Sequence, residues 1–183
     1  MRLKDCKKCE LYKTRNNVVF GRGAKNPKVV FVGEAPGYEE DKTGKPFVGK
    51  AGKCLRKLIK AMGLKMEEVY ITNVLMCRPP NNRTPNVLEI NACKKRLFAS
   101  LKRFDCPVVC LGRVAAETII GPNFKWGVWY EIQYNKKACA TFHPAYYLYR
   151  GGGISNGTSA FKRISRFLKK NSKKNAKTSE KDD

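Results

Sequence analysis

Short apolar runs alternate with stretches of helical periodicity along most of the chain. The run 28–32, which ends at Gly33, is typical of a buried strand, and Leu55, Leu58 and Ile59 recur at the spacing of one helix face. Similar patterns predict strands at 69–74 and 107–111, helices at 52–62, 85–104, 114–120 and 158–170, and strands joined by a turn within 126–142. This alternation predicts an α/β sandwich around a mainly parallel sheet.

The chain is long enough for one domain with its own core. Residues 1–170 are expected to form that domain, and in the helix at 85–104 we expect Val87, Ile90, Leu97 and Leu101 to face inward. Residues 171–183 are Lys-, Ser-, Asn- and Asp-rich without apolar periodicity, which predicts a basic disordered tail.

Three segments with distinctive residues leave predicted strands, beginning at Gly33, Asn73 and His143. In sheets of this kind, ligands bind in the loops beyond the carboxyl ends of the strands. We therefore expect these three segments to converge on one site.

The composition is strongly basic, with 38 Lys and Arg against 15 Asp and Glu and a formal net charge of +23. Such an excess attracts polyanions, so nucleic acid is the favoured partner, with a merely solvated basic surface as the alternative. No apolar stretch is long enough to cross a membrane, and the first residues lack the apolar segment of a signal peptide. These features predict an intracellular protein with reduced cysteines.

The acidic stretch at 33–52 contains a near match to a nucleotide-binding P-loop at 44–51. Ala51 stands where the magnesium-binding Ser or Thr belongs, and no strand leads directly into Gly44. Phe47 would also lie inside a loop that has to wrap phosphates. The pattern therefore disfavours a nucleotide site.

The eight cysteines fall into two sets. Cys6 and Cys9 form a C-x-x-C motif, and Cys77 and Cys93 bracket a loop and half of a predicted helix. Four such thiolates suit either zinc or an iron–sulfur cluster, and spacing alone leaves the metal open. The other cysteines are expected to be small buried hydrophobes; they are Cys54, Cys106, Cys110 and Cys139.

His143, the only histidine, follows an apolar strand and precedes Pro144. An imidazole at a strand exit can donate to an oxygen that gains negative charge during a reaction. The tyrosine-rich segment at 146–150 could wedge into a base stack, or it could form an ordinary aromatic edge of the core.

Five short motifs succeed one another: GEAPG at 33–37, PFVG at 46–49, TNV at 72–74, CRPP at 77–80 with NR at 82–83, and HPA at 143–145. In this order they resemble the family 4 uracil-DNA glycosylases, over roughly residues 3–168. The resemblance implies a three-layer α/β/α sandwich with a central, mainly parallel sheet. It also implies a 4Fe–4S cluster with the ligands Cys6, Cys9, Cys77 and Cys93.

The resemblance further implies how an extruded uracil is bound. Phe47 stacks on the base, and the Asn73 amide donates to O4 and accepts from N3–H. Glu40 fills the space that a thymine methyl group would need, and Gly37 belongs to the same substrate-binding loop.

For the chemistry, the resemblance implies that His143 bonds uracil O2 and stabilises the departing anion. Glu34 and the backbone of Ala35 are the candidates for holding water near C1′, with Glu40 and Asp41 nearby. A carboxylate could act there as a general base or by stabilising the cationic sugar electrostatically.

DNA contacts are expected from Arg78, Arg83 and Arg150, with either Tyr147 or Leu148 as the wedge residue. The segment 79–84 lacks the histidine of relatives that trap DNA covalently, so covalent trapping is not expected.

The function implied is a monofunctional glycosylase that removes uracil from DNA, acting as a monomer. A contact with a replication clamp is also considered. One alternative is an inactive iron–sulfur DNA-binding module that serves a replication or repair partner. A zinc-stabilised RNA-binding protein is another, favoured only by charge and cysteines.

Overall fold

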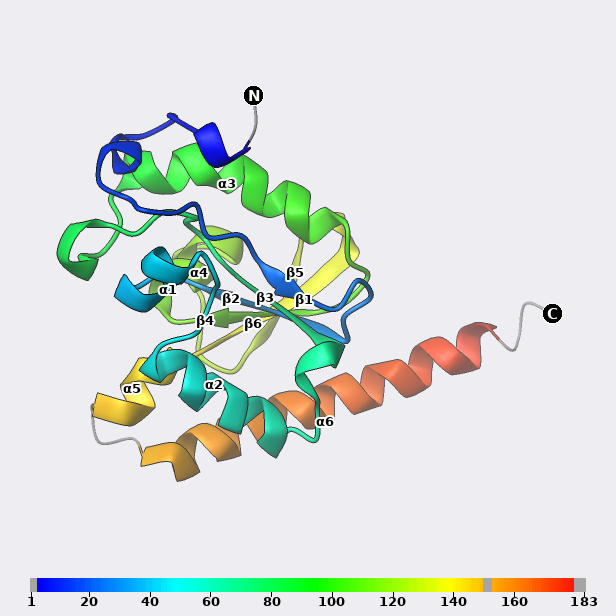
Figure 1. The fold of residues 1–183 in the computed structure, drawn as a ribbon. Coiled ribbons are helices and arrows are strands. Elements are labelled where there is room, and N and C mark those ends of the chain that lie inside the picture. Colours follow the sequence, from blue (N-terminus) through cyan, green and yellow to red (C-terminus); the bar gives the residue numbers. More distant parts are fainter. Residues whose placement is uncertain (1–2, 150–152, 180–183) are drawn as a thin grey trace.

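The computed structural model describes residues 3–149 and 153–179 (Figure 1). Its centre is a six-stranded sheet with the order β1-β3-β2-β4-β6-β5. The strands are β1 (Arg22–Gly23), β2 (Val29–Gly33), β3 (Val69–Asn73), β4 (Val108–Leu111), β5 (Trp129–Ile132) and β6 (Lys136–Thr141). The helices are α1 (Tyr38–Thr43), α2 (Lys50–Ala61), α3 (Val87–Lys102), α4 (Arg113–Ile119), α5 (Pro144–Tyr149) and α6 (Gly153–Ser179).

The four inner strands are parallel, and the edge strands β1 and β5 are antiparallel to their neighbours. The register pairs Gly33 of β2 with Asn73 of β3. Because parallel strands end at the same side of a sheet, the segments after β2, β3 and β6 emerge together. The mainly parallel sheet and the convergence expected from the sequence are confirmed.

Helices cover both faces of the sheet. Alternate β2 residues divide between two cores: Val30 and Val32 pack with residues of α3 and α4, while Val29 and Phe31 pack with residues of α2 and α6. Figure 1 shows α3 and α4 on one side of the sheet and α2, α5 and α6 on the other. This is the α/β/α sandwich that the sequence predicted.

The last helix differs from the prediction at both ends. It begins at Gly153 rather than at 158, and it continues beyond 170 to Ser179. Residues 158–179 include no Gly or Pro, and Lys and Ala favour helix, so nothing in the sequence stops α6 at 170. Helix thus replaces the disorder expected for 171–179, while 180–183 lie outside the described residues.

Several local expectations were incomplete. The prediction omitted β1, α1 and α5, all short elements. Val87, expected to face inward, is 70% exposed, because it is the first residue of α3; Leu97 and Leu101 are buried as expected. Across the described residues, no helix combines the length and apolarity that a membrane span requires.

Candidate active site

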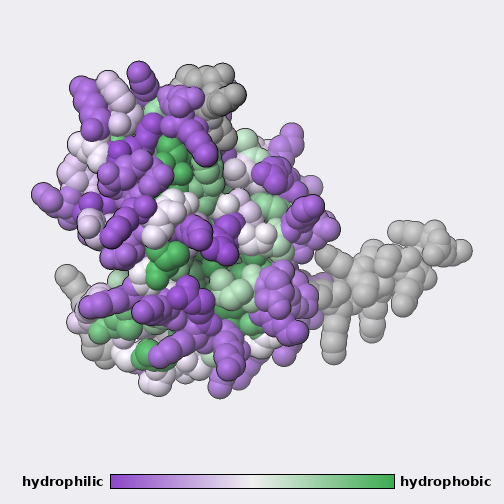
Figure 2. Space-filling view, viewed as in Figure 1, coloured by the Kyte–Doolittle hydropathy of each residue, from purple (hydrophilic) through white to green (hydrophobic). Residues whose placement is uncertain are grey.

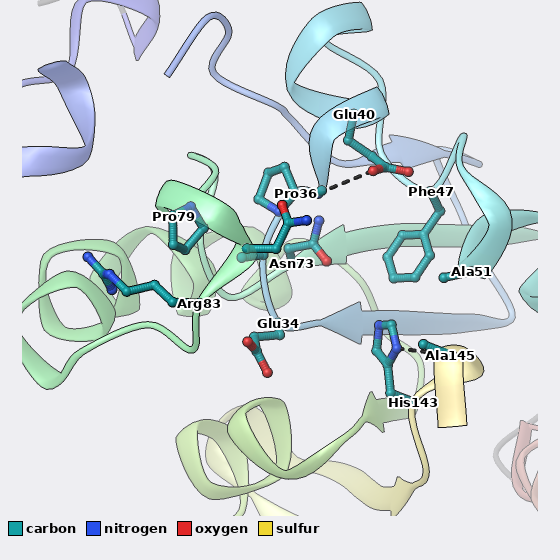
Figure 3. A pocket seen from close by; sticks show the side chains of 13 residues that line it. Glu34, Pro36, Glu40, Phe47, Ala51, Asn73, Pro79, Arg83, His143 and Ala145 are labelled. Carbon is teal, nitrogen blue, oxygen red and sulfur yellow. Dashed lines mark hydrogen bonds between the residues drawn. The ribbon is translucent and has the colours of Figure 1, made fainter. Parts of the chain in front are cut away.

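A pocket of about 380 Å³ opens where β2, β3 and β6 end (Figure 3). The β2–α1 segment, the α1–α2 loop, the end of β3 and the β6–α5 loop all contribute to it. Its lining residues are Glu34, Ala35, Pro36, Gly37, Glu40, Phe47, Ala51, Asn73, Pro79, Asn82, Arg83, His143 and Ala145. All seven residues expected to bind substrate or take part in the chemistry therefore lie together.

Asn73, the last residue of β3, has a buried side-chain oxygen without a hydrogen-bond partner in the described residues. The side chain is 5% exposed and lies close to the backbone of β2. A Cβ on Gly33 would lie only 2.4 Å from Asn73 Oδ1, so the glycine makes room for the amide. A buried acceptor without a partner costs about 1–3 kcal/mol, and a ligand that donates a hydrogen bond would remove that cost.

Phe47 adopts a backbone conformation that is unfavourable for a bulky residue, with φ at +53°. Its carbonyl accepts a hydrogen bond from Arg56 Nη1 at 3.0 Å, and a Cβ on Gly52 would lie 1.8 Å from the same carbonyl oxygen. The first turns of α2 therefore hold this loop in place. Such strain, maintained by surrounding contacts, is typical of functional positions.

Glu40 organises the loop that carries Phe47. Its Oε1 accepts hydrogen bonds from the backbone N–H groups of Val48 and Gly49, each at 2.8 Å, and its Oε2 accepts one from Gly37 at 3.1 Å. The carboxylate thus joins the start of α1 to the start of α2. Sequence reasoning assigned Glu40 to base selection and missed this supporting role.

His143 faces the Phe47 ring, with centroids 6.1 Å apart and ring planes at 32°. Its Nδ1 accepts a hydrogen bond from the Ala145 N–H at 3.2 Å, which leaves the proton of the neutral ring on Nε2. Burial lowers the pKa of His143 to about 4, although the Glu40 charge acts in the opposite direction. The imidazole is therefore a neutral donor at physiological pH.

The two other acidic candidates have different roles. Burial raises the pKa of Glu34, which lines the pocket. Asp41 is 1% exposed, and its carboxylate accepts hydrogen bonds from the backbone of Asn16 and Asn17. Asp41 therefore ties the N-terminal segment to α1, and it is not among the residues that line the pocket.

The two candidate wedge residues differ in exposure. Tyr147 is 5% exposed, with its hydroxyl 3.3 Å from Thr141 Oγ1, whereas Leu148 is 37% exposed. The helix α5 turns Tyr147 and Pro144 into the core, which disfavours Tyr147 as the wedge. Leu148 remains the candidate.

Two of the arginines expected to contact phosphates, Arg78 and Arg83, already have hydrogen-bond partners within the chain. Nη1 and Nη2 of Arg83 donate to the carboxylate of the buried Glu89, and Arg78 donates to Asn82 Oδ1 at 2.7 Å. The guanidinium of Arg78 also lies 5.3 Å from the Tyr38 ring centroid. The expected contact Arg150 lies outside the described residues.

The four candidate ligand cysteines occupy one region. Cys77 and Cys93 are buried in the core between the sheet and α3, and Cys9 packs against the same core. Burial raises the pKa of Cys93, and charge on Cys9 and Cys6 raises it further, which reflects how near the thiols are. Within residues 3–149 and 153–179, however, no group of three or more His, Cys, Asp or Glu side chains is arranged to hold a metal ion.

Two arginines surround this region. Arg15 donates to the Cys6 carbonyl and to Cys77 Sγ, and Arg96 hydrogen-bonds the Cys6 thiol. Burial would raise the pKa of Cys6, yet the Lys8 backbone N–H and the arginines lower it. The remaining four cysteines are buried, as predicted: Cys54, Cys106, Cys110 and Cys139.

Comparison with known proteins gives consistent matches. The Uracil DNA glycosylase superfamily model matches residues 20–169. The Type-4 uracil-DNA glycosylase of Archaeoglobus fulgidus is 44% identical over 171 residues, which cover 87% of this chain and 86% of that protein. The protein of the same name from Thermotoga maritima is 43% identical, over 80% of this chain and 80% of its own length. That from Sulfurisphaera tokodaii is 44% identical, over 79% of this chain and 71% of its own length.

Proposed function

The chain belongs to the uracil-DNA glycosylase superfamily, and we propose that it extrudes deoxyuridine from DNA and hydrolyses its N-glycosidic bond. Uracil and an abasic site are the products, so the protein starts base excision repair. The relatives named Type-4 uracil-DNA glycosylase support this activity. The observation that carries it in this chain is the buried, unpartnered oxygen of Asn73 in a pocket lined by Phe47 and His143.

Base selection follows from the two halves of one amide. Asn73 Oδ1 accepts from uracil N3–H, and Nδ2 donates to O4, while the Phe47 ring stacks on the base. Cytosine presents an acceptor at N3 and a donor at the exocyclic position, so both amide groups would be mispaired. Each buried mispaired group costs about 1–3 kcal/mol.

Departure of uracil places negative charge on its O2 oxygen. The Nε2–H of His143 donates to that oxygen, and the ring is held in this tautomer by the Ala145 N–H. Because the imidazole is already fixed and neutral, it stabilises the anion without prior loss or gain of a proton.

Water reaches C1′ from the side of Glu34 and the Ala35 backbone. Burial raises the pKa of Glu34, which makes its carboxylate a stronger base than an exposed one. The carboxylate can accept a proton from water or stabilise the cationic sugar by its charge.

A 4Fe–4S cluster fits the chemistry of the thiol-rich region, with Cys6, Cys9, Cys77 and Cys93 as ligands. The donors are all thiols, and Arg15 and Arg96 offset their negative charge. When bound, the cluster supplies a structural cross-link and no redox step to the hydrolysis. Its ligands connect the N-terminal segment with the chain on either side of the 79–84 loop.

DNA is held around the pocket, with Leu148 as the wedge that replaces the extruded nucleotide. Arg78, Arg83 and Arg150 approach the phosphates, and Arg83 keeps its Glu89 partner. We expect the protein to act as a monomer. A DNA substrate places the protein inside the cell, and a replication-clamp contact stays a prediction.

The proposed activity is tested by incubating the cluster-loaded protein with a single-uracil oligonucleotide and cleaving abasic sites with alkali. Matched oligonucleotides with thymine or cytosine at the same position serve as controls. We expect strand breaks only at uracil. If folded, iron-loaded protein produces no strand breaks, the result would instead favour the inactive DNA-binding module.

A further inference from the structure

Three aromatic side chains form a continuous stack beside the pocket. Phe142 stacks on Trp126 on one side and on Tyr146 on the other, with ring centroids 4.5 Å apart in both pairs. The ring planes deviate from parallel by 28° and 19°. Phe124 meets the Trp126 end at 90°. We call Trp126, Phe142 and Tyr146 the aromatic ladder.

The aromatic ladder is not part of the buried core. Trp126, Phe142 and Tyr146 are 37%, 36% and 36% exposed, although large rings usually bury more of their surface. Figure 2 shows hydrophilic side chains over much of the face it presents. Other exposed rings exist, such as Tyr38 and Tyr134, but the ladder rings are distinguished by being stacked on one another. Grouped exposed apolar side chains commonly mark a binding surface.

The ladder adjoins the candidate active site directly. Phe142 immediately precedes His143, and the Tyr146 N–H donates to the His143 carbonyl at 2.9 Å. Trp126 joins the same edge through a bridge to Ala140 of β6. A nucleotide chain whose uracil occupies the pocket therefore passes close to these rings.

The charge around the ladder fits a polyanion. The Arg113 guanidinium lies 6.0 Å from the Phe124 ring centroid, and its side chain is 68% exposed. The nearby carboxylate of Glu117 bonds Arg113, and the whole chain carries a net charge of +23. Aromatic rings beside a basic surface are a usual feature of sites for single-stranded nucleic acid.

We propose that the aromatic ladder binds unpaired bases that flank the extruded uridine on a single strand. Paired bases have their faces covered by stacked neighbours, whereas unpaired bases are free to pack on rings, face to face or edge to face. This inference rests on the proposed function and extends it to the conformation of the substrate. It gives the protein a preference for uracil in single-stranded or locally open DNA.

The test uses uracil-free DNA, so that binding is measured without catalysis. Dissociation constants for a single strand and for the matching duplex are determined for wild type, Trp126→Ala, Tyr146→Ala and the control Tyr134→Ala. Tyr134 is also exposed, at 43%, but it precedes β6 and so lies at the opposite end of the sheet from the pocket. We expect each ladder variant to weaken single-strand binding about 5- to 150-fold and duplex binding less than about 2-fold. The control Tyr134→Ala should weaken neither.

A second readout keeps the wild-type ladder intact. The chain has two tryptophans, and Trp129 stacks on Phe167 with centroids 3.8 Å apart. In a Trp129→Phe background, fluorescence reports Trp126 alone, and we expect the single strand to quench it and the duplex to leave it unchanged.

Equal losses for single strand and duplex, no loss for either, or unquenched Trp126 would each overturn the inference. So would a change in sedimentation with the ladder variants, which would assign the surface to a second copy of the chain. Uracil release by wild type from a single-stranded and from a duplex uracil oligonucleotide is measured alongside, and its absence from both would refute the proposed function without bearing on the binding result.

Discussion

The protonation state of His143 gives the sharpest test of how the site works. Because burial lowers the pKa of His143 to about 4, the ring stays neutral through the pH range in which an exposed histidine, with a pKa of 6.5, becomes charged. The perturbation is a titration from pH 8 to pH 4. We expect a single neutral form, with the proton on Nε2, down to about pH 5.

The same shift has a consequence for stability. Between pH 6.5 and 4 the unfolded chain binds a proton at His143 that the folded chain does not, so stability falls as the pH falls through this window. Above pH 6.5 the ring is neutral in both states, and the effect is absent. At pH 5 the loss amounts to about 2 kcal/mol, calculated from the two pKa values.

The assay is a ¹H–¹⁵N spectrum of the imidazole region, recorded on untagged protein. The chain has one histidine, so the signals need no assignment. Glu40→Gln serves as the matched variant: the Glu40 charge raises the pKa of His143, so its removal should lower that pKa further. A wild-type midpoint near pH 6.5, or a proton on Nδ1, would refute the assignment of His143 as a preorganised neutral donor.

Three further changes test other parts of the site. Asn73→Ala should slow single-turnover uracil release about 30-fold or more, because two buried hydrogen bonds to the base are lost. DNA affinity measured by anisotropy should stay nearly constant, and equal losses in rate and affinity would contradict the role of Asn73. Glu40→Gln should also raise KM for uracil DNA, since Gln has one acceptor oxygen in place of two and cannot accept the Gly37, Val48 and Gly49 N–H groups together; an unchanged KM would show that the Phe47 loop does not depend on Glu40. Cys77→Ala should lower iron content and melting temperature together, because cluster binding is coupled to folding, whereas full iron content would exclude Cys77 as a ligand.

Much of the site was predictable because it depends on strand ends. Asn73 and His143 each follow an apolar run, and parallel strands bring such positions to one edge of the sheet. Which of the two candidate wedge residues is exposed was not predictable, because Tyr147 and Leu148 are adjacent and only the turn of α5 decides which is buried.

Contacts made by tertiary packing were also missed. Nothing in the sequence marks Arg56 as the donor to the strained Phe47 carbonyl, since it looks like any exposed helical cation. The aromatic ladder joins Phe142 and Tyr146, which are close in the sequence, to the distant Trp126, and nothing in the sequence pattern links Trp126 to them. The extent of α6 beyond 170 was missed because polarity was read as disorder.

The central claim is that this pocket releases uracil from DNA by cleaving the N-glycosidic bond. The most direct measurement is mass spectrometry of the products from a single-uracil oligonucleotide treated with iron-loaded protein. We expect equal amounts of free uracil and of an oligonucleotide with one abasic site, both strongly reduced with Asn73→Ala. An unchanged oligonucleotide and no free uracil, from folded protein with full iron content, would contradict the account.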